Sequence, residues 1–519
     1  MIACESEFNS LIGKYYNAWF NYHPDLATKA GIKGYESKLP PLSNEHYGAL
    51  IALNEKAMCC IGEFSYCRLD EKEKNECTLV VGSILSERGD LLKKDWRVID
   101  PLRYIITDDL LILHLKSTNN NPHILSQLSQ YPKYLQTATK LLSIHPERIP
   151  MEWTTSAMSS VQQGIRLLNA FKKMDSFSTL DNSTLILSNA VKALTDYQDF
   201  LEKDIIANAN GNFANGEESY QQILQYKHLI DVDLEKITQF AEKLFRQTKA
   251  ELQALTIKIQ GNSDYLTLFN QLNQPNSDDV LASYQTSLSQ LHAFIENNSD
   301  LFSENSMMNV TVHPLPTELE AIYPDSLILK NGQSYCAMIE KKYSEINIMH
   351  QCVSQIMPGA LPQASNSIPR QLNASLLTTN GWESFCETMM IEHHYLDQPE
   401  NQFIFLFNKL KNTFAMLIDI DIHSQNLTIQ QAETKISAEF PNIKAINIIQ
   451  QSRQPCQQTC AVLGEYILSN YLRLLKIENN DASFKTLQNK IISNEALALP
   501  LLIQNDGKKY WEKIIKNIG

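Results

Sequence analysis

Apolar residues recur at three- and four-residue spacings through most of the first 300 residues, the spacing of one face of an α-helix. Polar stretches rich in Asn, Gly and Ser interrupt this pattern at residues 207–217 and 294–306, and they predict surface loops. We therefore expect an N-terminal, mainly helical lobe over residues 1–305. Its predicted helices cover residues 8–20, 124–144, 154–172, 185–206, 217–231 and 233–259.

The pattern changes after residue 306. Short β-branched and aromatic runs separated by Pro and Asn-Gly predict a small sheet, with strands in MNVTVHPLP, SLILK and SYCAMIEK. Helical spacing returns from about residue 345, so residues 306–519 are expected to form a second lobe. Its predicted helices cover residues 380–396, 401–423, 428–440, 457–476 and 482–493.

Length and charge narrow the possible classes of protein. A chain of 519 residues exceeds the roughly 250–300 residues that one core can serve, so two lobes are the expected arrangement. Hydrophobic residues make up 43% and charged residues 20%, which is typical of a globular protein. The net charge of -13 repels phosphate backbones, and we expect no nucleic-acid partner.

The cellular location is predicted from the first residues and the cysteines. The sequence begins without a basic segment followed by an apolar one, and no stretch reaches the roughly 18–20 apolar residues of a membrane span. Cys4 lies too close to the first residue for a lipoprotein cleavage site. The ten cysteines lack the spacing of a disulfide framework. We expect a cytoplasmic or otherwise intracellular protein, without a classical signal peptide or a membrane span.

Familiar catalytic motifs are absent from the sequence. It contains no His-Glu-x-x-His, Gly-x-Ser-x-Gly, Walker loop or Gly-x-Gly-x-x-Gly turn after a strand. Asp419 and His423 are four residues apart, which suits a metal or an oriented histidine, although spacing alone favours an ordinary ion pair. Cys386 is a possible nucleophile, but an inert core thiol is the simpler interpretation. Cys456 and Cys460 have no second ligand pair at zinc-site spacing, which favours ordinary buried thiols.

A Pro-Gly pair interrupts the apolar segment SQIMPGALPQ at residues 354–363. Both residues break regular structure, so they predict a sharp change of chain direction at a buried place. The segment carries no charge and no side chain that binds metals well. Its own residues therefore predict a corner without saying what chemistry the corner serves.

Several segments, taken in order, resemble the bacterial domain-of-unknown-function 885 family, whose members are similar to gluzincin-type zinc peptidases. They include HPDLATKAGIKGYESKLPPLS, GEESYQQILQYKHLIDVDLEKI, VTVHPLP, MPGALPQ, NGWESFCETMMIE, LIDIDIH and QPCQQTCAVLG. The resemblance covers nearly the whole chain. It implies a mainly α, two-lobed, carboxypeptidase-like fold with a deep cleft and a small β-sheet.

In that family the corner carries His-Glu-x-x-Pro-Gly-His, and the next helix begins with Glu-Gly-Trp. Six residues advance an ideal helix by about 600 degrees, so a Pro-Gly break is one way to bring both histidines to one metal. The resemblance places the two histidines on Ser354 and Ala360, the general base on Gln355 and the third ligand on Asn380. None of these residues supplies the ligand or base that the family uses.

Two positions farther along the chain also differ from the family pattern. The family's arginine before its Asp-x-Gly-x-His segment falls on Ala415, and the tyrosine after its Pro-Gly-Gln segment falls on Ala461. The positions that match the family pattern are mainly structural rather than chemical. The matching positions that we expect to line a cleft are Gly359, Gln363, Trp382, Glu387, Asp419 and His423.

These substitutions predict a pseudo-metallopeptidase that has lost its zinc ligands and general base. We expect no catalytic residues, no metal and no cofactor. The protein is expected to act by binding an unidentified peptide, protein or small ligand. The alternative is a hydrolase with a relocated metal or acid-base site built from Glu387, Asp419 and His423, with His350 or His394. A purely structural role for Asp419 and His423 also stays open.

Overall fold

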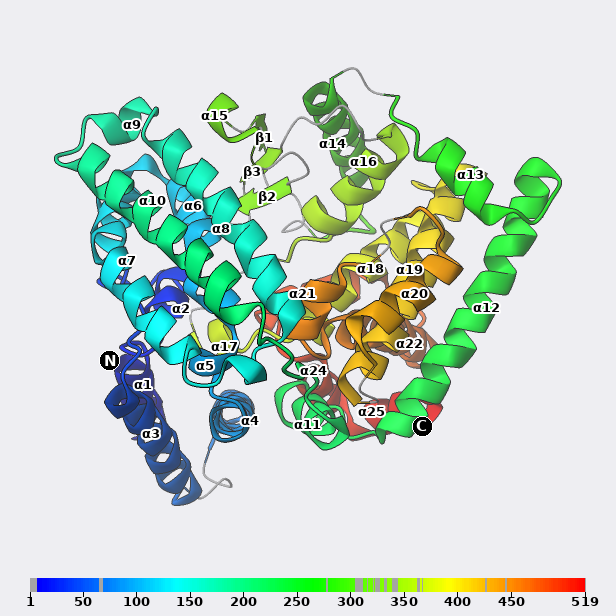
Figure 1. Cartoon of the computed structure of the whole chain (residues 1–519). Coiled ribbons are helices and arrows are strands. Elements are labelled where there is room, and N and C mark those ends of the chain that lie inside the picture. Colours follow the sequence, from blue (N-terminus) through cyan, green and yellow to red (C-terminus); the bar gives the residue numbers. More distant parts are fainter. Residues whose placement is uncertain are drawn as a thin grey trace. The chain divides into compact units, whose positions relative to one another are not determined.

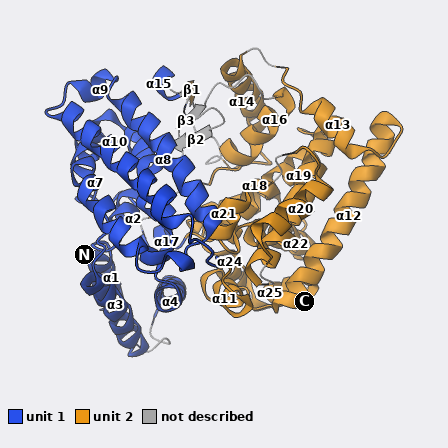
Figure 2. Ribbon diagram, viewed as in Figure 1, with its two compact units in different colours: residues 1–213, 316–323, 366–373 blue, residues 214–315, 324–365, 374–519 orange. Residues whose placement is uncertain are grey.

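The computed structural model is mainly helical, with three short strands in the part of the chain that it describes (Figure 1). The chain divides into two compact units, and Figure 2 colours them separately. Unit 1 comprises residues 1–213, 316–323 and 366–373, and unit 2 comprises residues 214–315, 324–365 and 374–519. This division differs from the predicted boundary between residues 305 and 306. The structure describes residues 7–64, 69–276, 279–303, 311–314, 316–320, 322, 327–330, 334–337, 344–361, 365, 367–424, 427–443 and 446–518.

Unit 1 contains the first ten helices and two short helices from later in the chain. The apolar stripe of its first helix is buried as predicted, with Phe8, Tyr16 and Trp19 in the core. Its α-helices are α1 (Glu7–Trp19), α2 (Pro24–Lys29), α3 (Asn44–Gly62), α4 (Glu71–Lys93), α5 (Trp96–Ile99), α6 (Thr107–Lys116), α7 (Asn121–Leu142), α8 (Met151–Phe171), α9 (Asp175–Ser178), α10 (Ser183–Phe200), α15 (Thr317–Glu320) and α17 (Ile368–Leu372). Short 3-10 turns cover Pro101–Tyr104, Thr118–Asn120 and Pro146–Arg148, and a π-helix at Leu201–Ile205 extends α10.

Unit 2 holds the remaining helices and the strands. Its α-helices are α11 (Glu217–Gln222), α12 (Leu234–Gln260), α13 (Tyr265–Leu272), α14 (Val280–Asn297), α16 (Glu345–Gln351), α18 (Leu376–Glu392), α19 (Pro399–Ser424), α20 (Ile429–Glu439), α21 (Ile448–Arg453), α22 (Gln457–Glu478), α23 (Phe484–Ser493), α24 (Leu499–Asp506) and α25 (Lys508–Ile518). Two π-helices, Ile223–Lys227 and Cys352–Ile356, extend α11 and α16.

The predicted sheet is confirmed, and it is small. Its strands are β1 (Thr311–Pro314), β2 (Leu327–Lys330) and β3 (Ser334–Ala337), in the order β1-β3-β2. Strand β1 runs parallel to β3, with Thr311 opposite Ser334, and β2 runs antiparallel to β3, with Leu327 opposite Ala337. Each strand has only four residues, so the helices supply nearly all of the core.

Helices α18 and α22 pack at backbone contact distance in unit 2. A Cβ atom at Gly464 would lie 2.2 Å from the carbonyl oxygen of Leu377 and 2.8 Å from Cα of Gly381. A Cβ atom at Gly381 would lie 2.5 Å from Cα of Gly464. Because atoms cannot approach so closely, glycine at both positions lets the two helices cross without a side chain between them.

Hydropathy does not point to a transmembrane helix in the described part of the chain. No helix there combines the length and the apolar character needed to cross a bilayer.

Substitution of Gly464 tests this crossing. Alanine improves helix propensity, yet Gly464→Ala should lower the free energy of unfolding by at least about 1–3 kcal/mol, because its methyl group meets backbone. Gly13→Ala in α1 is the matched control, since no atom lies within 4 Å of the added Cβ. It should be neutral or slightly stabilising in the same chemical denaturation experiment. A Gly464→Ala protein as stable as the parent would contradict the close packing.

Candidate functional site

The predicted corner is present and buried. The π-helix Cys352–Ile356 ends at a cis Met357–Pro358 peptide bond. The Met357 N–H donates to the Cys352 carbonyl at 2.8 Å, and the Gly359 N–H donates to the Val353 carbonyl at 3.0 Å. A Cβ atom at Gly359 would lie 1.8 Å from the carbonyl oxygen of Ser354, so the chain can double back here only with glycine.

Trp382 fastens the corner to α18. Its indole Nε1 donates to the carbonyl of Pro358 at 3.0 Å, and the ring stacks on Phe484 with centroids 5.4 Å apart. The side chain is fully buried. Trp382 was expected to line a cleft, and the structure places it in the core beneath the corner.

The four positions that the resemblance assigns to metal ligands and base lie at this corner and on the first turns of α18. Ser354 donates from Oγ to the carbonyl of His350 at 2.9 Å, and Asn380 accepts from the Thr379 hydroxyl at 3.0 Å. Gln355 and Ala360 are partly buried, like the other two. Hydroxyl, methyl and neutral amide groups therefore occupy these positions. Gln363, also expected here, lies outside the described residues.

Ionisable groups gather farther along α18. The ring Nδ1 of buried His350 lies 3.5 Å from Oε1 of Glu387. Burial, followed by the charge of Glu387, raises the pKa of Glu383 to about 7. Burial lowers the pKa of the Lys411 ammonium, which donates to Asn408 at 3.4 Å. His394 is exposed and adopts a positive φ, so it does not share the buried surroundings of His350.

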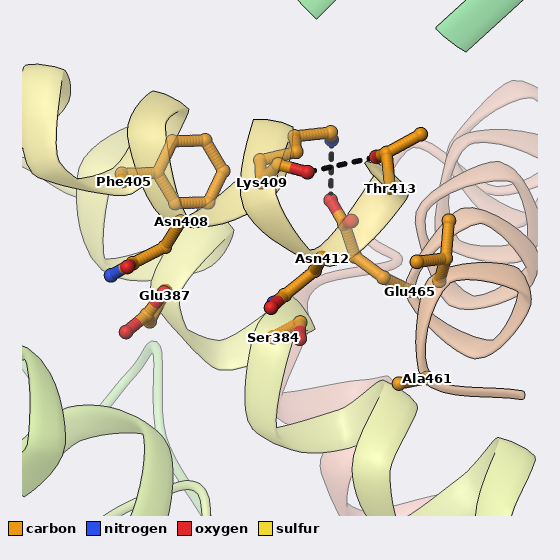
Figure 3. Close-up of a pocket in the computed structure, with 10 residues that line it drawn as sticks. Ser384, Glu387, Phe405, Asn408, Lys409, Asn412, Thr413, Ala461 and Glu465 are labelled. Carbon is orange, nitrogen blue, oxygen red and sulfur yellow. Dashed lines mark hydrogen bonds and ion pairs between the residues drawn. The ribbon is translucent and has the colours of Figure 1, made fainter. Parts of the chain in front are cut away.

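A polar pocket opens between α18, α19 and α22 (Figure 3). Its centre is the ion pair of Lys409 and Glu465, with Nζ 2.6 Å from Oε1. The Thr388 hydroxyl also donates to Glu465, at 3.3 Å. The cavity volume is about 20 Å³, room for about one water molecule. The lining residues are Ser384, Glu387, Phe405, Asn408, Lys409, Asn412, Thr413, Ala461, Val462 and Glu465.

Two expected positions meet in this pocket. Glu387 lines it, and so does Ala461, where the resemblance predicts the family's tyrosine. Ala415, where the resemblance predicts the family's arginine, is buried.

The sequence patterns did not predict Lys409 and Glu465, the charged centre of the pocket. Lys409 lies on a mainly polar face of α19, beside Asn408, Asn412 and Thr413, so its charge alone does not indicate a buried partner. The periodicity of each helix does not show which charge it meets.

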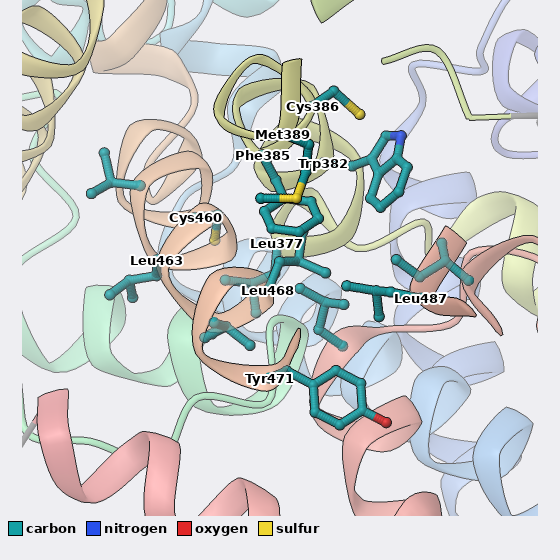
Figure 4. Packing of buried hydrophobic residues seen from close by; sticks show 14 of the residues in the cluster. Leu377, Trp382, Phe385, Cys386, Met389, Cys460, Leu463, Leu468, Tyr471 and Leu487 are labelled. Atoms are coloured by element: carbon teal, nitrogen blue, oxygen red, sulfur yellow. The ribbon is translucent and has the colours of Figure 1, made fainter. Parts of the chain in front are cut away.

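The opposite face of α18 belongs to the hydrophobic core (Figure 4). Trp382, Phe385, Cys386 and Met389 pack there among residues of α22 and α23. Cys386 is fully buried, and burial raises the pKa of its thiol. A neutral thiol without access to solvent is a poor nucleophile, which favours the core interpretation of this cysteine.

Asp419 is fully buried in α19, and its carboxylate is held from two directions. The Tyr220 hydroxyl donates to Oδ2 at 3.0 Å, while Thr459, near the start of α22, donates from its hydroxyl at 3.2 Å and its backbone N–H at 3.4 Å. Burial raises the pKa of Asp419 to about 7, although these hydrogen bonds lower it in part. Buried polar contacts thus surround Asp419, and the site is closed to solvent.

His423 bonds to backbone more closely than to Asp419. Its Nε2 donates to the carbonyl of Gln451 at 3.0 Å and lies 3.9 Å from Oδ1 of Asp419. Cys456 and Cys460 are buried beside this cluster, and burial raises the pKa of both thiols. Across the residues that the structure describes, no three or more His, Cys, Asp or Glu side chains form a group able to hold a metal ion.

The raised pKa of Asp419 predicts a pH dependence of stability. Between its ordinary value of 3.8 and about 7, the folded state keeps a proton that the unfolded state releases. Stability should therefore decline as pH rises through this range, by up to about 4 kcal/mol, and then level off.

Comparison of Asp419→Asn with the parent isolates this effect, because asparagine cannot ionise. Denaturant unfolding at several pH values should show a smaller decline in the variant. The control is Asp421→Asn, since Asp421 pairs with Lys435 at 2.7 Å near the surface. That variant should retain the full decline, and an unchanged decline in Asp419→Asn would contradict the assignment.

Two solved structures share the fold of almost the entire chain. One is a protein of unknown function from Shewanella oneidensis, with 16% identity and a TM-score of 0.76, covering 96% of this chain and 100% of its own. The other is from Colwellia psychrerythraea, with 13% identity and a TM-score of 0.79, covering 98% of this chain and 99% of its own. These similarities establish the mainly helical fold. No curated protein matches the chain.

Both solved structures are provisionally described as lipoproteins. This description contradicts the prediction of a cytoplasmic or otherwise intracellular protein, and we withdraw that prediction. That prediction rested on the first residues and on cysteine spacing. The lipoprotein description instead comes from proteins that share the fold of almost the entire chain. Cys4 lies outside the described residues.

The predicted family is confirmed by a family model that matches more than half of the chain. The matched residues, 24–328, end before the Pro-Gly corner, so the assignment of Ser354, Gln355, Ala360 and Asn380 rests on the motifs around them. The chain belongs to the family described as bacterial protein of unknown function (DUF885).

Proposed function

We propose that this chain is a non-catalytic member of its family, a pseudo-metallopeptidase that binds a peptide, protein or small ligand without hydrolysing it. The gluzincin-like relationship and the deep cleft that accompanies it are part of this proposal. One observation carries it. The corner is present, and hydroxyl, methyl and neutral amide groups occupy the positions that the resemblance assigns to its ligands and base.

The proposal is supported by a contrast between the residues that build the corner and those at its predicted ligand positions. Gly359 packs against the backbone of Ser354, and Trp382 donates a hydrogen bond to the backbone of Pro358. Ser354, Gln355 and Asn380 supply only neutral oxygen and nitrogen groups, whereas zinc sites use imidazole, thiolate or carboxylate. Gln355 has the shape of a glutamate and no basic carboxylate.

The pocket around Lys409 and Glu465 is the place in unit 2 where we expect a ligand group to enter. Its ion pair is compact, and Glu387, Asn408 and Asn412 add hydrogen-bonding groups around it. A volume of about 20 Å³ admits one small polar group about the size of a water molecule, such as a hydroxyl. Such a group would exchange hydrogen bonds with the ion pair.

The description of the two solved structures as lipoproteins is compatible with a binding role. A lipid anchor would hold such a protein at a membrane surface, where it could capture a ligand without turning it over.

A second candidate function is a hydrolase that uses the paired carboxylates Glu383 and Glu387. It is favoured by the pKa of Glu383, which is raised to about 7, because a carboxyl group titrating near neutrality can act as a general acid or base.

Zinc content tests the main proposal. Protein purified without added metal should contain no stoichiometric zinc by mass spectrometry. The combined variant Ser354→His, Gln355→Glu, Ala360→His and Asn380→Glu should bind about one zinc ion per chain, because the frame that positions these residues is intact. Ser354→His alone is the matched control, and it should bind none. Stoichiometric zinc in the parent, lost on substitution of Glu387, Asp419 or His423, would overturn the proposal.

Hydrolysis assays separate the second candidate from the first. The proposal predicts no turnover of fluorogenic peptides or esters between about pH 5 and 9, the range in which a carboxyl group of pKa near 7 changes charge. Activity that follows this titration and disappears in Glu383→Gln, with the fold retained, would favour the hydrolase. Glu392→Gln serves as the matched control, because Glu392 is an exposed glutamate at the end of the same helix and does not line the pocket.

A further inference from the structure

Besides the pocket around Lys409 in unit 2, the structure has a pocket in unit 1 that plays no part in the proposed function. It lies between α2, α6 and α7 and the segment that follows α2, and its volume is about 100 Å³. This volume is several times that of the pocket around Lys409. It has room for a group of several heavy atoms.

Hydrogen bonds hold the segment after α2 against α7. Gln127 Nε2 donates to the carbonyl of Glu36 at 2.6 Å, and Gln130 Nε2 donates to the carbonyl of Ser37 at 2.9 Å. The Ser37 hydroxyl also lies 2.9 Å from Nδ1 of His123. These contacts fix the next residues, Lys38 to Pro40, as one wall of the pocket.

Basic side chains outnumber acidic ones around this pocket. Four basic residues and two acidic residues line it, although the protein as a whole carries a net charge of -13. Lys29 pairs with Asp109 at 2.9 Å, which balances one charge of each sign. Lys116, the last residue of α6, has no such carboxylate within the described chain. A cationic group therefore remains available beside the cavity.

The uncharged part of the lining is mainly apolar, with Thr28 and Gln127 as its polar members. Ile106, Leu110, Leu113 and Tyr134 contribute side chains from α6, the residue before it and α7, and all four are buried or partly buried. Ile112 is 36% exposed at the edge. The pocket thus combines an apolar wall with a cation, an arrangement that suits a molecule with one anionic end.

We propose that this pocket binds small carboxylic acids with an apolar body. The carboxylate meets the Lys116 ammonium, and the body lies against Ile106, Leu110 and Leu113. Burial and the neighbouring charge of Lys29 lower the pKa of Lys116, and an anion at this position relieves both effects. The same chemistry occurs in free fatty acids and at the C-terminus of a peptide that ends in an apolar residue.

Calorimetric titration of the full chain with four probes tests this proposal. Octanoate and N-acetyl-leucine carry both parts of the ligand, acetate lacks the apolar body, and N-acetyl-leucinamide lacks the charge. Octanoate or N-acetyl-leucine should bind with one site per chain, and acetate and the amide at least about tenfold more weakly. Tighter binding of octanoate identifies a free acid as the source, and tighter binding of N-acetyl-leucine identifies a peptide terminus.

Two substitutions locate the binding site. Lys116→Met keeps the length of the side chain and removes its charge, so it should weaken binding by about tenfold or more. Ile112→Asp places a negative charge at the exposed edge and should abolish binding. Lys192→Met is the control, because Lys192 is an exposed lysine of α10 that does not line the pocket. Circular dichroism establishes that each variant is folded.

Several results would overturn the proposal. They are no heat of binding with any probe, equal affinity for N-acetyl-leucine and its amide, or unchanged affinity in Lys116→Met. These outcomes leave the proposal for unit 2 untouched, because the zinc measurement does not depend on the pocket in unit 1.

Discussion

The crossing of α18 and α22 is the contact on which the site in unit 2 depends. Gly381 and Gly464 allow two helix backbones to touch, and the residues next to them then point in fixed directions. Trp382 follows Gly381 and holds the corner through its hydrogen bond to Pro358. Glu465 follows Gly464 and forms the ion pair with Lys409. A small change in the distance between these helices would therefore move both the corner and the pocket.

Local sequence patterns predicted the elements and the corner. Three- and four-residue spacing gave helices close to α7, α8, α12 and α22, and β-branched runs gave the strands, because both signals are contained within a few consecutive residues. The Pro-Gly pair gave the corner for the same reason. The same patterns did not predict α3, α4 and α6. Polar residues interrupt the apolar stripe of α3 and α4, and α6 is short.

Contacts between distant segments could not be predicted in the same way. Tyr220 reaches Asp419 across 199 residues, and Lys409 meets Glu465 across 56. Nothing in either helix alone specifies such a partner. The division into units also depends on contacts between distant segments, since α15 and α17 join unit 1 from positions late in the chain.

Folding depends more on the residues that build the corner than on those at the four predicted ligand and base positions. Gly359 and Trp382 are buried and make contacts that no other side chain can reproduce. Ser354, Gln355, Ala360 and Asn380 are only partly buried, so neutral residues fit there at little cost to stability. The contacts that build the corner thus do not depend on which side chains stand at these four positions.

Anomalous diffraction at the zinc absorption edge, from crystals of the parent protein soaked in zinc, shows whether the corner binds a metal ion. We expect no anomalous peak within the usual bonding distance of about 2.0–2.3 Å from protein atoms at the corner. A strong peak there, coordinated by side chains of residues 354–360 and the start of α18, would contradict this expectation.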